Sequence, residues 1–225
     1  MCGRFTQTHS TEAIATAFQL AVVPLLTPRY NIAPTQFIAT VLKTAQQPER
    51  HFKVLQWGLI PSWAKDSSIG AKLINARSET VTEKPSFRAA FRYRRCLVVA
   101  DGFYEWQRQE RKKQPFYFHL QDHQPFAFAG LWEHWQSPEG EPLETCTILT
   151  TAANDVLTPV HDRMPVILHP ENYDTWLDPE LQTASILQPL LRPYPEAEMI
   201  AYPVDSAVNR ASCDRPECIQ PLNSQ

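Results

Sequence analysis

A cysteine at position 2 gives the chain its most distinctive reactive group. Methionine aminopeptidases remove Met1 before so small a residue, so the mature chain is expected to begin with Cys2. Its amine and thiol, on adjacent carbons, can condense with an aldehyde to a Schiff base and then close a thiazolidine ring. At pH 7.4 an α-amine with a pKa near 7.7–8.0 is roughly 20–30% neutral, against about 0.1% for a lysine. The same cysteine could instead be the nucleophile for amide cleavage, or position 2 could be a frayed, inert terminus.

Two other residues have settings that suit proton transfer. Glu105 lies between Tyr104 and Trp106, where partial desolvation would raise the pKa of its carboxyl toward neutrality. The alternative is a strand glutamate that points outward. His161 follows a turn and precedes a strand, where a neighbouring group can orient its ring. The alternative for His161 is a structural histidine.

Residues that could bind a ligand occur in two further segments. Asn75 and Arg77 are two positions apart, so on a strand they would present an amide and a guanidinium from one face. Arg77 could contact a phosphate with both arms of its guanidinium, or it could pair with Glu79. Trp63 follows a proline turn; it can stack on a base if it is exposed, and it belongs to the core if it is buried.

Cysteine and glycine usage excludes several classes of protein. An odd number of cysteines, widely spread, argues against a disulfide framework and favours reduced thiols. Cys213 and Cys218 form a C-x4-C pair, but without a second pair this is a weak zinc signal, and no metal or cofactor is predicted. The six glycines form no G-x-G-x-x-G or Walker loop, which argues against nucleotide-dependent enzymes.

Composition predicts a cytoplasmic protein with no membrane partner. Hydrophobic residues make up 43% of the chain and charged residues 20%, as in soluble globular proteins. No apolar run approaches the ~18 residues of a membrane helix. The first residues lack the basic and apolar regions of a signal peptide.

Positive charge is concentrated in one segment. Residues 84–113 contain nine basic and three acidic residues, a net charge of +6, so the remainder carries −9 of the total of −3. Such asymmetry is typical of a surface that binds a polyanion. It is equally consistent with a solvated helix face and hairpin tip.

The pattern of elements predicts one α+β domain, residues 1–225, without repeats or long linkers. Short runs of strand type dominate, and strands in succession with scattered helices favour mostly antiparallel pairing. A first helix is expected from Ser10 or Thr11 to about Leu20. Strands are expected at 37–42, 52–57, 96–100, 116–120, 126–132, 145–150, 165–168 and 199–204. Further helices are expected at 86–93, 170–176 and 181–191.

Seven segments together resemble the SRAP family of SOS-response-associated peptidase-like proteins. They occur in the family's order along the chain, at residues 1–5, 29–34, 57–63, 75–80, 100–106, 150–154 and 161–165. The resemblance implies a single SRAP domain with a barrel-like core of mostly antiparallel strands and short peripheral helices. It also implies a shallow positive channel for single-stranded DNA.

The resemblance further implies that the chain senses abasic sites and captures the ring-opened aldehyde as a thiazolidine crosslink, which shields the lesion. Cys2 would then be the nucleophile, Asn75 would hold the opened sugar, and Glu105 and His161 would transfer protons. The DNA contacts would come from Arg4, Arg77, Trp63, Pro34, Thr150 and Arg163. Ser62 stands where some relatives have a second aromatic residue, so stacking is expected to be weaker here.

Two other functions stay open at this stage. The family's name records a peptidase activity, which would use the same Cys2 as the nucleophile of a thiol peptidase or autopeptidase. A non-catalytic reader of nucleic acid would explain the basic segment but leaves Cys2 without a role. The expected partner is single-stranded DNA that contains abasic sites. The protein is expected to be a monomer that associates with the nucleoid when it is bound to DNA.

Overall fold

A closed barrel forms the centre of the computed structural model, which describes residues 2–108, 110 and 112–222. Five strands pair in the order β10–β4–β3–β6–β9, and β9 pairs again with β10, which closes the ring. Every pairing in the ring is antiparallel except that of β4 with β10. These strands are β3 (Phe37–Leu42), β4 (His51–Trp57), β6 (Arg95–Ala100), β9 (Phe126–Gln136) and β10 (Pro142–Ala152).

Three short strands extend the barrel at its rim. Two of them pair with the last residues of β10: one is parallel to it and the other antiparallel. The third pairs with the start of β9. These strands are β5 (Asn75–Arg77), β11 (Arg163–Pro165) and β12 (Ile167–Leu168).

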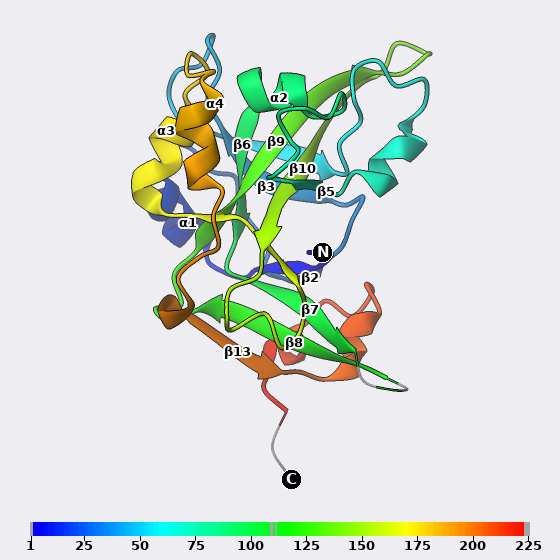
Figure 1. Cartoon of the computed structure of the whole chain (residues 1–225), viewed down its shortest axis with the longest axis vertical. Coiled ribbons are helices and arrows are strands. Elements are labelled where there is room, and N and C mark those ends of the chain that lie inside the picture. The colour runs from blue at the N-terminus through cyan, green and yellow to red at the C-terminus, as the bar shows by residue number, and fades with distance from the viewer. Residues whose placement is uncertain (1, 109, 111, 223–225) are drawn as a thin grey trace.

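A second sheet, entirely antiparallel, lies below the barrel in the view of Figure 1. Its order is β13–β8–β7–β1–β2, so the short N-terminal strand lies inside the sheet and not at its edge. Phe5 of this strand makes edge contacts with Trp57 at 5.2 Å and with Phe128 at 5.8 Å between ring centroids, which packs the sheet against the barrel. The strands are β1 (Phe5–Gln7), β2 (Arg29–Ile32), β7 (Gly102–Arg108), β8 (Lys113–Leu120) and β13 (Met199–Pro203).

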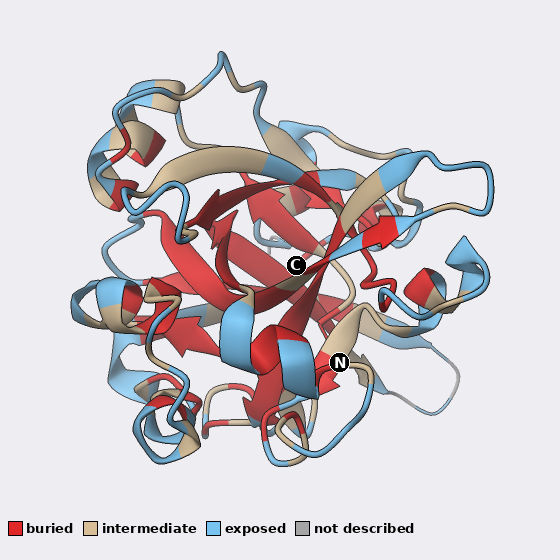
Figure 2. Ribbon diagram, turned by 90° about the horizontal axis from the view of Figure 1, so that it is seen from above, coloured by how far each residue is buried: buried red, intermediate tan, exposed pale blue. Residues whose placement is uncertain are grey.

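Helices are short and lie outside the buried strands (Figure 2). The first begins after Ser10, whose hydroxyl accepts a hydrogen bond from the Ala13 amide, as an N-cap should. The α-helices are α1 (Thr11–Phe18), α2 (Arg88–Tyr93), α3 (Tyr173–Leu177) and α4 (Ala184–Leu187). Turns of 3₁₀ helix occur at Ser67–Lys72, Pro170–Asn172, Gln188–Leu190, Glu196–Glu198, Ser206–Asn209 and Pro216–Ile219.

The predicted α+β fold with a barrel-like core is confirmed, with local differences. The helix expected at 181–191 is reduced to α4 and one 3₁₀ turn, because Pro189 lacks the amide that would continue an α-helix. In addition, the Leu181 carbonyl is bound by the Arg95 guanidinium at 2.8 Å. The strand expected at 165–168 is divided into β11 and β12, which pair with different strands. No helix among the described residues is long and apolar enough to cross a membrane.

Candidate functional site

Cys2 lies in the interior, where the N-terminal segment meets β7. Phe5 pairs with Phe103 in antiparallel register, and the Tyr104 amide donates to the Arg4 carbonyl at 3.0 Å. Continuing this register places Cys2 beside the residues that follow Tyr104. Its side chain is 0% exposed. The interpretation of position 2 as a frayed terminus is therefore wrong.

A buried carboxylate fixes this pair of strands. Asp101, in the turn before β7, accepts hydrogen bonds from the side chain of Thr6, the backbone and hydroxyl of Thr8, and the backbone and ring of His9. Burial opposes the charge of Asp101, but these hydrogen bonds hold the pKa of its carboxyl below the usual value. The same contact raises the pKa of His9. The ion pair therefore anchors β1, the strand that follows Cys2.

Glu105 is buried on β7, with 3% of its surface exposed. Burial raises the pKa of its carboxyl, and the nearby charge of His161 opposes part of that rise. Burial, followed by the charge of Glu105, raises the pKa of the Cys2 thiol well above its usual range. These interactions require Glu105 to lie close to both residues. The alternative of an outward-pointing glutamate is excluded.

His161 has its ring oriented by its own segment. Its Nδ1 accepts a hydrogen bond from the Arg163 amide at 3.0 Å, so in the neutral ring the proton is on Nε2. The Asp162 carboxylate lies 3.0 Å from the same Nδ1 and can accept from it when the ring is charged. The backbone amide of Arg163 and the carboxylate of Asp162 therefore hold the His161 ring in a defined orientation.

A surface pocket of about 400 Å³ reaches both Glu105 and His161. Glu105 and His161 line it together with two cations of the basic segment, Arg108 and Lys113. Its remaining lining residues are Trp106 and Asn209. An anionic ligand can therefore approach Glu105 and His161 from solvent.

Asn75 lies on β5, in parallel register with Ile148 of β10. Its Nδ2 is 3.5 Å from the Ile148 carbonyl, and its buried Oδ1 has no hydrogen-bond partner in the described part of the chain. The neighbouring Ile74 packs in the same apolar cluster as Cys2 and Val160. The cluster brings the segments that carry Asn75, Cys2 and His161 to one region.

Arg77 is exposed on β5. Glu79, the residue with which it could have paired, is instead paired with Arg163. Glu79 is bound by both arms of Arg163, at 2.6 and 2.9 Å, and this contact lowers the pKa of Glu79. Arg163 also donates to the carbonyl of Thr150, whose side chain is fully buried. Arg77 is left facing solvent, while Arg163 and Thr150 hold the end of β10.

Arg4 is held from several sides. Three of its N–H contacts are with protein oxygens: Asn31 Oδ1 at 2.8 Å, the Val208 carbonyl at 2.8 Å and the Asn209 carbonyl at 3.2 Å. Its guanidinium carbon also lies 6.0 Å from the centre of the Trp106 ring. A phosphate contact would use the donors that remain.

Of the two residues expected near splayed bases, Trp63 is 60% exposed and Pro34 is half-buried. The exposure of Trp63 supports stacking over a place in the core. Pro34 follows β2 and Trp63 follows β4. The amide of Thr35, next to Pro34, donates to the carbonyl of Trp57, the last residue of β4, at 2.8 Å.

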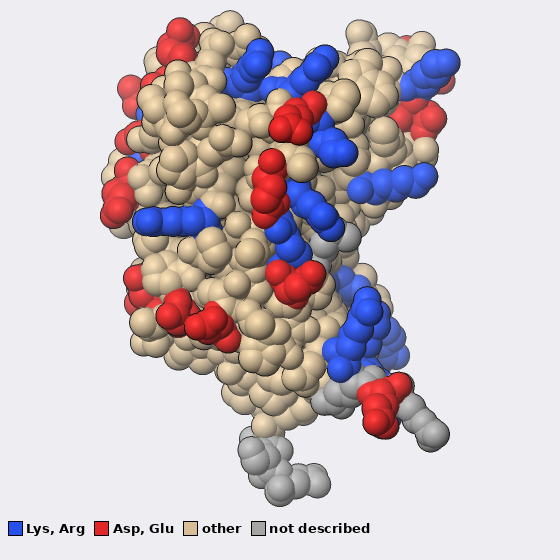
Figure 3. Space-filling view, viewed as in Figure 1, with Lys and Arg blue, Asp and Glu red and all other residues tan. Residues whose placement is uncertain are grey.

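The basic segment does not form one surface. Arg95 is buried among backbone carbonyls, and Arg94 pairs with Glu133. Arg88 and Arg92 are exposed on α2, whereas Arg108, Lys112 and Lys113 lie on the hairpin of β7 and β8; Arg111 is outside the described residues. Lys and Arg gather beside a hollow at the right of the face in Figure 3, with Asp and Glu among them. The exposed cations therefore lie on a helix face and on a hairpin, as the alternative interpretation expects, and polyanion binding stays a prediction.

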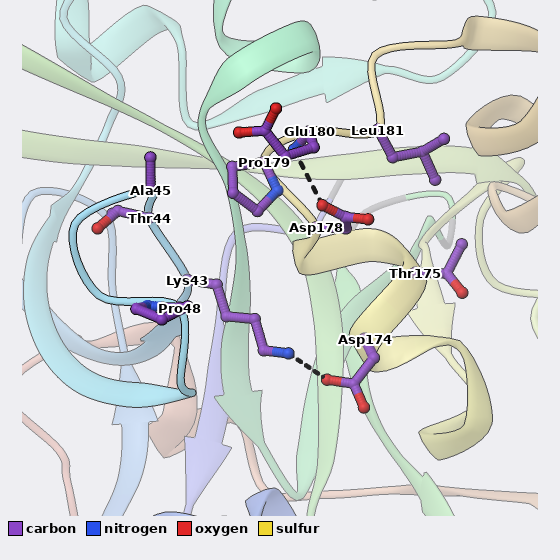
Figure 4. Close-up of a pocket in the computed structure, with 10 residues that line it drawn as sticks. All are labelled: Lys43, Thr44, Ala45, Pro48, Asp174, Thr175, Asp178, Pro179, Glu180 and Leu181. Atoms are coloured by element: carbon purple, nitrogen blue, oxygen red, sulfur yellow. Dashed lines mark hydrogen bonds and ion pairs between the residues drawn. The ribbon is translucent and has the colours of Figure 1, made fainter.

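Another pocket, of about 530 Å³, is lined by the turn after β3 and by α3 (Figure 4). Lys43 crosses it to reach Asp174 at 2.7 Å. None of the reactive or binding residues described above lines this pocket.

Sequence reasoning missed the residues that hold the N-terminal strand. Asn31 is 0% exposed, and its Nδ2 donates to the carbonyls of Val208, Arg210 and Cys213. These partners are more than 170 positions away, so no local pattern could indicate them. Asp101 gave a local signal, because it directly precedes the Gly102 that begins β7, but its partners lie at positions 6–9.

Comparisons with known proteins agree with one another. The family model for SOS response associated peptidase (SRAP) matches residues 1–211. The chain is 46% identical over 224 residues to the abasic site processing protein YoqW of Bacillus subtilis (strain 168), covering 98% of this chain and 99% of that one. It is 35% identical to the abasic site processing protein HMCES of Xenopus tropicalis, covering 85% of this chain and 65% of the relative. The crystal structure of a Bacteroides thetaiotaomicron protein, 28% identical, matches 98% of this chain and 100% of that one with a TM-score of 0.85. The chain belongs to the SRAP family.

Proposed function

We propose that this chain processes abasic sites in single-stranded DNA, using Cys2 to capture the ring-opened sugar as a thiazolidine crosslink. The observation that carries the proposal is the interior position of Cys2 beside Glu105, in a region that His161 and a solvent-facing pocket share. The names of the relatives YoqW and HMCES, both abasic site processing proteins, supply the substrate class.

The chemistry follows from the groups present. The neutral amine of mature Cys2 adds to the C1′ aldehyde, and the resulting hydroxyl leaves as water to give a Schiff base. The thiol then adds to the same carbon, and its proton passes to the nitrogen. A protonated carboxyl is needed as the hydroxyl departs, and the raised pKa of Glu105 keeps that form available toward neutral pH. His161, with its proton on Nε2, serves ring opening and proton return.

The remaining residues are assigned by their exposure and contacts. Arg77 contacts a phosphate, and Trp63 and Pro34 contact bases, since these three reach solvent. Asn75 offers its unpaired Oδ1 to the opened sugar. Arg4 and Arg163 contact phosphates through the N–H groups that their protein contacts leave unused. Thr150 is fully buried, so it acts by accepting from Arg163 and holding that side chain in place. No cofactor enters the proposal, and a monomer suffices.

A thiol peptidase that uses the same Cys2 is the second candidate, because the family's description includes a peptidase. A thiol peptidase needs a thiolate, but burial and the charge of Glu105 raise the pKa of the Cys2 thiol. Thiazolidine formation begins at the amine and does not require a thiolate in its first step. The electrostatics of the site therefore favour aldehyde capture.

The test combines intact mass with a denaturing gel. The purified chain should lack Met1 and should form a denaturation-resistant adduct with an abasic single-stranded oligonucleotide. Cys2→Ser should leave only an adduct that borohydride traps, and an alanine inserted before Cys2 should abolish the stable ring. Cys146→Ser, which removes another fully buried thiol, is the matched control and should react at the wild-type rate. A stable adduct at the wild-type rate in the inserted variant would disprove the proposal.

A further inference from the structure

Two thiols that the proposed chemistry does not use face each other near the C-terminus. The Sγ atoms of Cys213 and Cys218 are 3.5 Å apart, and both residues are free cysteines. Cys213 is partly exposed, whereas Cys218 is 2% exposed. The pair follows residue 211, where the match to the family model ends. It is thus a feature of this chain beyond the part that defines the family.

The loop between these cysteines is attached to the N-terminal site. Asp214 binds Arg29 Nε at 2.6 Å and accepts from the amides of Tyr30 and Asn31. Asn31 in turn donates to the Cys213 carbonyl at 2.8 Å and accepts from Arg4. A chain of contacts therefore runs from the loop through β2 to a residue two positions from Cys2.

We propose that Cys213 and Cys218 form a reversible disulfide, with a low-molecular-weight disulfide such as oxidised glutathione as the oxidant. A disulfide needs the sulfurs to approach from the present 3.5 Å to about 2.0 Å. The more exposed Cys213 attacks oxidised glutathione, one glutathione leaves, and a mixed disulfide forms. Cys218 then attacks the sulfur of Cys213 and displaces the second glutathione. In all, two protein thiols are oxidised and one glutathione disulfide is reduced to two thiols.

The two cysteines differ in a way that fits this order of events. The more exposed Cys213 meets the oxidant first. Burial raises the pKa of Cys218 to about 11, so Cys218 must first give up its proton to solvent before it attacks Cys213 as a thiolate, which makes closure of the disulfide the slower step. Cys2 is fully buried whereas Cys213 is partly exposed, so a dissolved disulfide meets Cys213 before Cys2. Oxidation would therefore close the loop that holds β2 while leaving the Cys2 thiol intact.

The experiment places the full chain in glutathione buffers of stepped redox potential, followed by acid quenching, alkylation and tryptic mapping. Arg215 is followed by proline, where trypsin does not cut, so both cysteines fall in one peptide that begins at Ala211. We expect this peptide to lose two hydrogens under oxidising buffer and to recover them with excess reduced glutathione. Cys2, Cys96 and Cys146 should be alkylated throughout. The Tm should rise by about 5 °C on oxidation, as expected for cross-linking a six-residue loop in a chain of this length.

Variants separate the disulfide from a general effect of oxidant. Cys218→Ser should accumulate glutathione on Cys213, and the double variant Cys213→Ala/Cys218→Ala should show no Tm change with redox potential. Hydrogen exchange at the Tyr30 and Asn31 amides should slow on oxidation of the wild type only, because Asp214 accepts from both. The proposal is overturned if both cysteines are recovered alkylated, or as separate glutathione adducts, under oxidising buffer. None of the three readouts, peptide mass, Tm and hydrogen exchange, depends on DNA, so the result is independent of the proposed capture of abasic sites.

Discussion

Replacing Glu105 by glutamine removes a proton donor from the buried site with little change in shape. Glu105 is 3% exposed, and glutamine has no acidic proton to give to the departing hydroxyl. Positioned proton transfer contributes about 10²–10⁴-fold to rate. From the middle of that range, we expect the capture rate to fall by about 10³-fold, or roughly 4 kcal/mol at 1.36 kcal/mol per decade.

The Glu105→Gln substitution that lowers the capture rate should not lower the stability of the fold. The pKa of Glu105 is raised above its unfolded value near 4.5, so the folded chain binds more protons than the unfolded chain between the two values. Stability contributed by the neutral carboxyl is therefore present below that unfolded value and is lost as pH rises through the folded pKa. Glutamine cannot ionise and escapes this loss. At pH 7.5 the Tm of Glu105→Gln should equal or exceed that of the wild type, and the two should converge near pH 4.

The assay is single-turnover crosslinking to an abasic oligonucleotide from pH 5 to 9, with binding to undamaged DNA measured in parallel. The wild-type rate should rise as the Cys2 amine becomes neutral and fall as Glu105 loses its proton, whereas the variant should lack the fall. Glu133→Gln is the matched control, because Glu133 is also a buried strand glutamate, 6% exposed, but pairs with Arg94 at 2.7 Å. It should lower Tm and leave capture unchanged. A wild-type capture rate in Glu105→Gln, with correct folding, would refute the role of this carboxyl.

Three further predictions concern binding, the sugar site and pH. Arg77→Ala should reduce the log–log salt slope of single-stranded DNA binding by roughly 0.7 and leave Tm unchanged, because Glu79 already pairs with Arg163. The control Arg192→Ala, outside the site, should leave the slope unchanged. A lowered Tm with an unchanged slope in Arg77→Ala would contradict the assignment. Asn75→Ala should slow capture at least about 10-fold, as measured by single-turnover rates. Its Tm in melting scans should stay within about 2 °C of the wild type, because the lost Oδ1 has no hydrogen-bond partner among the described residues. His9→Asn should lower Tm most below pH 6.5 and least at pH 9. The pKa of His9 is raised in the folded chain, so its stabilisation is complete below the pKa of the unfolded chain and is lost as pH rises through the pKa of the folded chain. An equal loss of Tm at both pH values would count against the ion pair with Asp101.

The strands of the barrel were predictable because their information is local. The segment 37–42 matches β3 at both ends, and the segments 96–100 and 126–132 lie within β6 and β9. Apolar runs of this kind bury themselves in any fold that has a core. The short strands β1 and β2 were not predicted, since three or four residues carry too little pattern and become strands only by pairing with β7 and with each other.

The sequence alone determined which candidate reactive groups the chain offers: the amine and thiol that Cys2 would carry once Met1 is removed, the carboxyl of Glu105, the imidazole of His161 and the amide of Asn75. Those properties belong to residue types and to position in the chain. Only the tertiary structure decided that Cys2 is buried beside Glu105, that Arg163 and not Arg77 pairs with Glu79, and that Trp63 faces solvent. Burial, pairing and pKa depend on segments that are distant in sequence and adjacent in space, because desolvation and Coulomb interactions act through distance between atoms and not through distance along the chain.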